Sequence, residues 1–187
     1  THYYNNDKAL ENINLEINKG EFVCLVGESG SGKSTLLSII STLLKPTKGE
    51  LFFENLNYKN IKDIDDFRKT NIGFIFQFHY LINYLTVKEN IKLANEKATE
   101  NEIHNLLKIL RIENLSNKYP NEISGGQRQR VSIARALINK PKVIIADEPT
   151  GNLDSKNSLN VFEIFKKLSE SGTTIIVATH DKDLAKF

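Results

Sequence analysis

The fold of this chain is decided by the stretch Gly27-Glu28-Ser29-Gly30-Ser31-Gly32-Lys33-Ser34-Thr35, which fits the pattern G-x-x-x-x-G-K-[ST] in full. The apolar run Phe22–Val26 precedes it and is typical of a strand buried on both faces of a sheet. A helix is expected from about Lys33 to Leu44, before Pro46. In this context glycines let backbone N–H groups converge on phosphate oxygens. The stretch therefore predicts a nucleotide site in an α/β protein.

Two side chains of this loop have specific expected contacts. Lys33 would contact the β- and γ-phosphates, and the Ser34 hydroxyl would ligate Mg²⁺. An acidic side chain at Glu28 would repel phosphate, so we expect it to point to solvent. The other loop positions expected at the ATP site are Gly27, Glu28, Ser29, Gly30, Ser31, Gly32 and Thr35, with only the side chain of Glu28 directed away.

Composition limits the class of protein. The 187 residues suffice for one well-cored domain, and a formal charge of +2 argues against strong general attraction to nucleic acid. The single cysteine, Cys24, lies in an apolar run, where it acts as a small hydrophobe and favours a reducing, intracellular setting. No apolar run approaches the roughly 20 residues needed to cross a bilayer.

The order of apolar patterns predicts an α/β fold with a mostly parallel sheet and a helical insert in the middle of the chain. Helical spacing runs from about Tyr80 to Asn139. We expect one domain over residues 1–187, with residues 1–77 and 138–187 as nucleotide-binding core and residues 78–137 as helical subdomain. The expected further strands are Ile13–Ile17, Leu51–Phe53, Ile72–Phe76, Val143–Ala146 and Thr174–Ala178.

Polar residues follow three of these strands. Because parallel strands end at one edge of a sheet, their side chains should meet there. Asp147 could hold Mg²⁺, and Glu148 could polarise an attacking water as general base; the alternative is a solvated acidic pair. His180 is expected at the same edge, against the alternative of a structural histidine. Gln77 could reach the Mg²⁺ or the water.

A second glycine turn, Ser124-Gly125-Gly126-Gln127, opens a helix with Val131, Ala134 and Ile138 on one face. A turn of this kind at a helix N-terminus is a second anion site. One nucleotide pocket does not require two such sites, so the second would serve a nucleotide held by another copy. Arg128, Arg130 and Arg135 are interpreted as a solvated helix face, with a nucleic-acid stripe as the alternative.

With these residues named, the sequence resembles the nucleotide-binding subunit of ABC transporters along essentially its whole length. Ser124–Gln127 matches the signature motif of that family, with Ile123 where Leu is most frequent. Gly27–Thr35 is similar to its Walker A loop and Val143–Asp147 to its Walker B strand. The resemblance implies that Glu148 is the catalytic glutamate, Gln77 the Q-loop glutamine and His180 the H-loop histidine. It also implies that Gly151-Asn152-Leu153-Asp154 is the D-loop. Tyr4, with Tyr3 in reserve, would be the aromatic residue that stacks on adenine, although simple packing of both tyrosines is equally open.

The resemblance implies an α/β fold: a P-loop NTPase core with a mixed, mostly parallel sheet, an N-terminal antiparallel β part and an inserted α-helical subdomain. It also implies an ATPase that dimerises head-to-tail around two ATP with Mg²⁺. The residues expected to contact ATP in trans are Ser124, Gly125, Gly126, Gln127 and Asp154, and those expected at the metal are Ser34, Gln77 and Asp147.

It further implies an integral membrane permease that docks near Phe78–Leu85, a place on the cytoplasmic face of the membrane, and no nucleic-acid partner. Family members usually continue for one or two helices beyond His180, so this chain resembles a trimmed domain.

The motifs are most similar to the branch that serves macrolide exporters and lipoprotein-releasing complexes, whose partners often transmit mechanical force. Amino-acid and peptide transporters share much of this pattern. The alternative function is a soluble ABC-type ATPase that acts on nucleic acid or the ribosome. A kinase or GTPase would leave Ser124–Gln127, Asp154 and His180 without roles. The transported substrate and the direction of transport are not encoded in these motifs.

Overall fold

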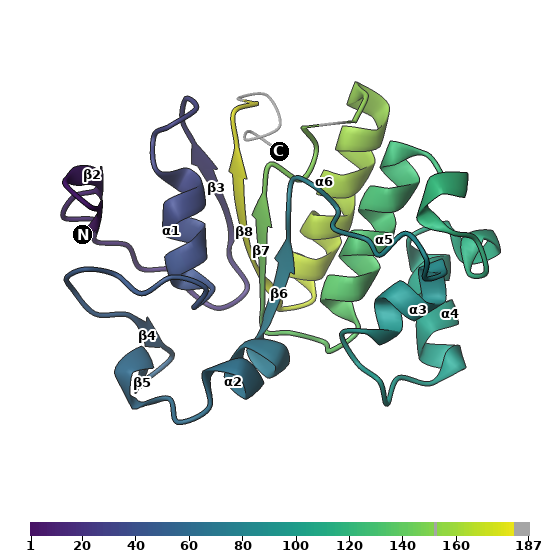
Figure 1. Ribbon diagram of the computed structural model, residues 1–187, viewed down its shortest axis with the longest axis horizontal. Helices are drawn as coiled ribbons and strands as arrows, with labels where there is room; N and C mark the ends of the chain where they lie inside the picture. The colour runs from purple at the N-terminus through teal and green to yellow at the C-terminus, as the bar shows by residue number, and fades with distance from the viewer. Residues whose placement is uncertain (152, 182–187) are drawn as a thin grey trace.

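A four-stranded parallel sheet, in the order β3-β8-β7-β6, forms the centre of the computed structural model (Figure 1). The structure describes residues 1–151 and 153–181; Asn152 of the expected D-loop and residues 182–187 lie outside them. The strands are β3 (Phe22–Val26), β6 (Ile72–Ile75), β7 (Val143–Asp147) and β8 (Thr174–Thr179). Four of the predicted strands therefore lie in this sheet, and all four run in the same direction.

Helices cover both faces of this sheet, which explains why its central strands are continuous apolar runs. Ile145 and Ile176 face one side and pack with Leu37 of α1. Ile144 and Ile175 face the other side and belong to a cluster with residues of α5 and α6. The covering helices are α1 (Lys33–Ile40), α5 (Gly125–Leu137) and α6 (Ser155–Glu170).

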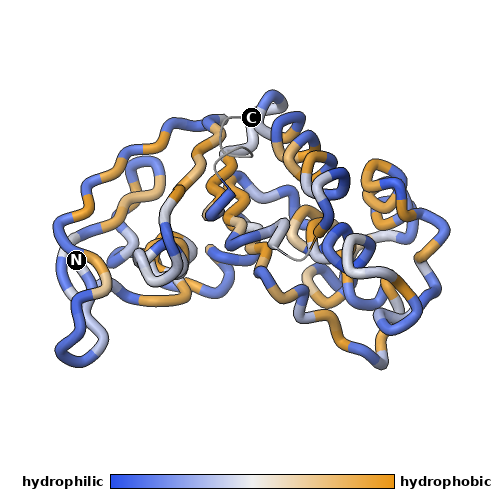
Figure 2. Tube along the Cα trace, turned by 90° about the horizontal axis from the view of Figure 1, so that it is seen from above, coloured by the Kyte–Doolittle hydropathy of each residue, from blue (hydrophilic) through white to orange (hydrophobic). Residues whose placement is uncertain are grey.

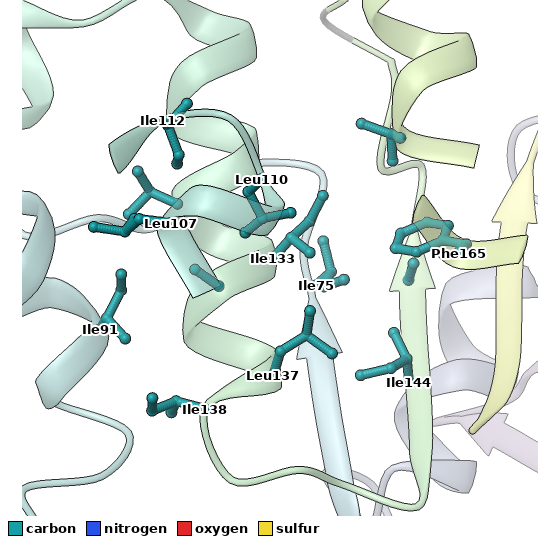
Figure 3. Packing of buried hydrophobic residues seen from close by; sticks show 14 of the residues in the cluster. Ile75, Ile91, Leu107, Leu110, Ile112, Ile133, Leu137, Ile138, Ile144 and Phe165 are labelled. Atoms are coloured by element: carbon teal, nitrogen blue, oxygen red, sulfur yellow. The ribbon is translucent and has the colours of Figure 1, made fainter. Parts of the chain in front are cut away.

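The larger core joins the sheet to the helical segment (Figure 3). Ile75 of β6, Ile133 of α5 and Leu107 of α4 are fully buried in one cluster. Hydrophobic segments run through the interior of the molecule, while hydrophilic positions predominate on its outer turns (Figure 2). The remaining helical elements are α2 (Ile64–Asn71), α3 (Val87–Lys92), α4 (Glu100–Ile109) and the 3₁₀ turns Tyr58–Asn60, Glu113–Leu115 and Pro120–Glu122.

Reciprocal side-chain caps begin the first two α-helices of the segment 78–137. Thr86 and Glu89 exchange hydrogen bonds at the start of α3, and Thr99 and Glu102 do so at the start of α4. In residues 1–151 and 153–181, no helix has the length and apolar character needed to span a membrane.

Two antiparallel hairpins form the N-terminal β part: β1 (His2–Tyr4) with β2 (Asp7–Leu10), and β4 (Phe52–Phe53) with β5 (Leu56–Asn57). The strand predicted over Ile13–Ile17 was wrong. No described segment pairs with it, and Ile13 and Leu15 are about half exposed. An alternating pattern specifies a half-buried surface, but a strand also requires a neighbour for its N–H and C=O groups.

The helix predicted to reach Leu44 ends at Ile40 instead. Thr42 adopts a left-handed φ of 66°, and Arg68 of α2 donates to both the hydroxyl and the carbonyl oxygen of Thr42. This tertiary contact holds the chain in a turn before Pro46 is reached. Cys24 is half-buried in β3, and this burial raises the pKa of its thiol, in agreement with the expected role as a small hydrophobe.

Candidate nucleotide site

The glycine loop connects β3 to α1 at the carboxyl edge of the sheet (Figure 1). Gly32 caps α1 with a φ of 89°, which favours glycine. A Cβ atom there would lie 2.7 Å from the carbonyl oxygen of Ala9 and 2.9 Å from a methyl group of Leu10. Gly32 is therefore required both by its backbone conformation and by the close passage of β2.

The start of α1 is arranged to receive an anion. In the described chain no side chain caps this terminus and no acidic residue lies in its first turn, so its N–H groups are available. The Nζ atom of Lys33 bends back over the loop and donates to the carbonyl oxygens of Gly27, at 2.6 Å, and Glu28, at 2.9 Å. Ser34 is exposed beside it, and Glu28 is exposed, as predicted for an acid kept away from phosphate.

The ends of β7 and β8 bring the predicted acidic residues to the same edge. Asp147 is the last residue of β7, and its Oδ1 atom is buried without a hydrogen-bond partner within the described chain. Glu148 turns sharply with a φ of 46°, and its N–H group donates to the carbonyl oxygen of Ala178 in β8. This turn fixes where the Glu148 carboxylate leaves the sheet.

Glu148 and His180 are in direct contact. The Nδ1 atom of His180 lies 2.9 Å from Oε2 of Glu148, whose side chain is only 15% exposed. A Cβ atom added to Gly151 would lie 3.5 Å from Nε2 of Gln77, so the glutamine lies beside the turn that follows Glu148. The structure thus brings Gln77, Glu148 and His180 together from three different strand ends.

The second glycine turn begins α5, which covers the opposite face of the sheet from α1 (Figure 1). Ser124 caps the helix: its backbone N–H donates to Gln127, and its hydroxyl accepts from the N–H group of Gln127. Asp154 caps α6 as an acceptor only, taking hydrogen bonds from the N–H and the side-chain amide of Asn157. These bonds, first that from the N–H of Asn157, lower the pKa of Asp154.

The turn and the Asp154 cap are neighbours. A Cβ atom at Gly126 would lie 3.4 Å from the side chain of Asn157, and Arg130 donates to the Asn157 amide oxygen. Figure 1 shows this pair of helix starts at the same edge as the phosphate loop, with the strands between them. One chain therefore carries both anion sites without joining them.

The interpretation of three arginines as a solvated face was wrong. Arg128 donates to the carbonyls of Pro120 and Ile123, and Arg135 to those of His79 and Tyr80. Arg130 donates to Leu110 and, as above, to Asn157. The three side chains are partly buried and tie distant segments together. Only the fold could reveal this, because all their partners except the Asn157 side chain are backbone oxygens.

The expected aromatic contact lies at the end of β1. Tyr4 is half exposed, with its ring at the edge of His2, whereas Tyr3 is less exposed and its N–H donates to Thr47. Tyr4 is thus the more accessible of the two for a ligand.

Sequence reasoning missed Asn90 of α3, which is fully buried. Its side-chain oxygen accepts from the N–H of Ile82, and its amide donates to the carbonyls of Ile82, Leu85 and Thr86. An asparagine within the apolar face of a helix was the only available signal.

Two hollows lie away from these residues. One of about 370 Å³ lies between α4, α5 and α6, with Leu106, Ile109 and Ile164 in its wall. Another of about 990 Å³ adjoins Ile13 and Phe52. Neither is lined by a predicted nucleotide contact. The predicted nucleotide contacts therefore lie outside both hollows, at the carboxyl edge of the sheet.

The parallel sheet, the phosphate loop at its carboxyl edge and the acidic strand beside it define a nucleoside-triphosphate hydrolase of the P-loop class. Residues 10–151 match the family model described as ABC transporter, and the chain belongs to that family. It is an ATP-binding subunit that hydrolyses ATP.

Similar proteins include the lipoprotein-releasing system ATP-binding protein LolD of Aquifex aeolicus, at 46% identity over 96% of this chain and 84% of that protein. The macrolide export ATP-binding/permease protein MacB of Campylobacter jejuni is 47% identical over 94% of this chain but only 29% of its own length. The dimeric post-hydrolysis structure of the cassette MJ0796 of Methanocaldococcus jannaschii, bound to ADP and Pi, matches with a TM-score of 0.87 at 43% identity, over 95% of this chain and 82% of that chain.

Proposed function

We propose that two copies of this chain close head-to-tail around two ATP and drive an integral membrane permease for export, lipoprotein release or mechanical signalling. The observation that carries this proposal is the separation of the two anion sites. The phosphate loop begins α1 and the Ser124–Gln127 turn begins α5, and these helices lie on opposite faces of one sheet, so a second copy is needed to complete each site.

In this arrangement the phosphate loop and Lys33 bind the phosphates, and Tyr4 stacks on adenine. Glu148 accepts a proton from the attacking water, and its contact with His180 orients the carboxylate. Gln77 lies close enough to the turn after Glu148 to respond to the same water. Ser124–Gln127 and Asp154 complete the partner's site.

The residues present fit a magnesium ion. Asp147 presents a buried carboxylate oxygen without a partner in the described chain, and Ser34 an exposed hydroxyl; both are hard oxygen ligands. We assign the ion to Ser34, Asp147 and Gln77. When bound it would neutralise charge on the phosphates.

The permease would dock on residues 78–85, where Phe78, Tyr80 and Tyr84 are exposed, and would hold the subunit at the cytoplasmic face of the membrane. Residues 1–77 and 138–187 would act as the nucleotide-binding core, with residues 78–137 as the helical subdomain.

The contacts of Arg128, Arg130 and Arg135 with backbone carbonyls leave no free arginine stripe on α5 for nucleic acid.

The test is the dependence of ATPase rate on protein concentration. A dimeric site predicts that the rate per subunit rises with concentration and then saturates. Gly126→Trp, which places a ring against Asn157 at the shared face, should abolish turnover but leave ATP binding to the phosphate loop intact. A rate per subunit that stays constant down to nanomolar concentration would contradict the dimer.

A further inference from the structure

The loop after Gln77 is held at both ends by side chains of the helical segment. Asn90 of α3 binds the backbone of Ile82, Leu85 and Thr86. Arg135 of α5 binds the beginning of the loop, with Nη1 2.8 Å from the carbonyl oxygen of Tyr80 and Nη2 2.7 Å from that of His79. The backbone of this loop is therefore tied to two helices, while its aromatic side chains face outward.

The Arg135 contact is a fork: two nitrogens of one guanidinium bind two successive carbonyl oxygens. This geometry restricts both distance and angle, and an ammonium group cannot reproduce it. Burial lowers the pKa of Arg135 but leaves it charged, because arginine titrates far above neutral pH. The charge strengthens both hydrogen bonds in their partly buried surroundings.

The same helix begins at the second glycine turn. Ser124 caps α5, and Arg135 lies about 16 Å further along its axis at 1.5 Å per residue. Between them α5 is an uninterrupted helix with Val131 and Ile133 buried in the main core, so it can transmit displacement as a rigid rod. A movement of the turn therefore reaches the two loop carbonyls through Arg135.

We propose that Arg135 is a positioning residue that couples the Ser124–Gln127 turn to the loop 78–86. When the turn engages ATP held by the partner copy, α5 shifts, and the Arg135 fork carries the loop with it. The inference rests on the proposed dimer and adds to it the specific connection by which ATP binding changes the permease-docking surface.

The experiment compares variants in a Glu148→Gln background, in which ATP is held without turnover. Gel filtration with and without ATP reports dimer closure, and hydrogen exchange of peptides covering residues 77–86 reports the loop. The Glu148→Gln parent should dimerise when ATP is added, and hydrogen exchange in the loop should then slow about tenfold. Arg135→Gln should still dimerise with ATP but lose most of that change.

Arg128→Gln is the matched control, because Arg128 lies on the same helix and also donates to two carbonyls, but outside the loop. It should keep the loop response. Arg135→Lys protects the test against misfolding: it retains charge and length and should recover only part of the response. A full loop response in Arg135→Gln would overturn the inference. Loss of ATP-dependent dimerisation in both Arg135 variants would also overturn it, because that result would assign Arg135 a general structural role. A parent that stays monomeric with ATP would instead overturn the proposed function itself.

Discussion

His180 contacts Glu148 through Nδ1 and Oε2 at 2.9 Å, at the ends of two strands that pair directly in the sheet. The backbone adds a second link, because the N–H of Glu148 donates to the carbonyl of Ala178, two residues before His180. Glu148 is thus held through its backbone by Ala178 and through its carboxylate by His180. Orientation of this kind is what a general base requires before a water is bound.

Glu148→Gln should retain ATP binding but lower turnover by about 10²–10³-fold, because an amide cannot accept the proton of the attacking water. The isosteric change keeps the site shape, so ATP-bound dimers should accumulate on gel filtration. Steady-state ATPase assays and equilibrium nucleotide binding measure the two effects separately. Unchanged turnover would remove Glu148 from the role of base.

His180→Ala should lower turnover by about 10–10²-fold with little change in ATP affinity, because it frees the Glu148 carboxylate without removing it. If the histidine acts through this carboxylate, adding His180→Ala to Glu148→Gln should cause little further loss. A double-mutant cycle on the rate measures this coupling. Fully additive losses would assign His180 an independent contact.

Lys33→Ala should weaken ATP binding by at least about tenfold, since a charge-assisted contact to phosphate is lost. The folded protein should remain intact, because among the described residues the Lys33 side chain donates only to loop carbonyls. Lys62→Ala, an exposed lysine before α2, serves as control. Fluorescence titration with a nucleotide analogue compares the two variants, and equal affinities would contradict the assignment.

Gly32→Ala should destabilise the protein more than Gly49→Ala, although both glycines have positive φ. The shared conformational cost is about 1–2 kcal/mol. Only at Gly32 would the methyl group meet a backbone carbonyl, that of Ala9, and this overlap adds about 1–3 kcal/mol. Urea unfolding of both variants measures the difference in their free energies of unfolding. Equal destabilisation of the two variants would show that β2 moves aside freely and would contradict the prediction.

Acid should destabilise the chain in part through its helix caps. Hydrogen bonds lower the pKa of three glutamates below 4.5. Glu89 accepts from the hydroxyl and the N–H of Thr86, and Glu102 accepts from the N–H and the hydroxyl of Thr99. Glu122 accepts from the N–H of Tyr119. A lowered folded-state pKa adds stability that is complete above the unfolded value and disappears as pH falls through the folded value. The wild type should therefore lose stability below about pH 4.5.

The triple variant Glu89→Gln, Glu102→Gln, Glu122→Gln tests this effect. Gln preserves the capping hydrogen bond but not the titration. The stability difference from wild type should be largest near neutral pH and disappear as pH falls, measured by urea unfolding across pH. Glu96→Gln is the control, since Glu96 is exposed and caps none of the described helices. A difference independent of pH would contradict the capping origin.

The sequence alone determined the elements whose residues act locally. Glycines at fixed spacing after an apolar run specify the phosphate loop, because only that backbone permits close approach to an anion. Buried runs such as Val143–Ala146 specify central strands and therefore the edge at which Asp147 and Glu148 emerge. These features depend on residues close together in the chain.

The tertiary structure alone decided the contacts between distant segments. Ile13–Ile17 has a strand pattern but no pairing neighbour in the described chain, and α1 ends where Arg68 binds Thr42. Arg135 resembles a surface residue until the fold places two carbonyl oxygens, more than fifty residues earlier in the chain, within reach of its guanidinium. Every residue carries a backbone carbonyl oxygen, so no pattern of side chains indicates which of these acceptors is used. Only the folded chain shows which carbonyl oxygens a charged group will contact.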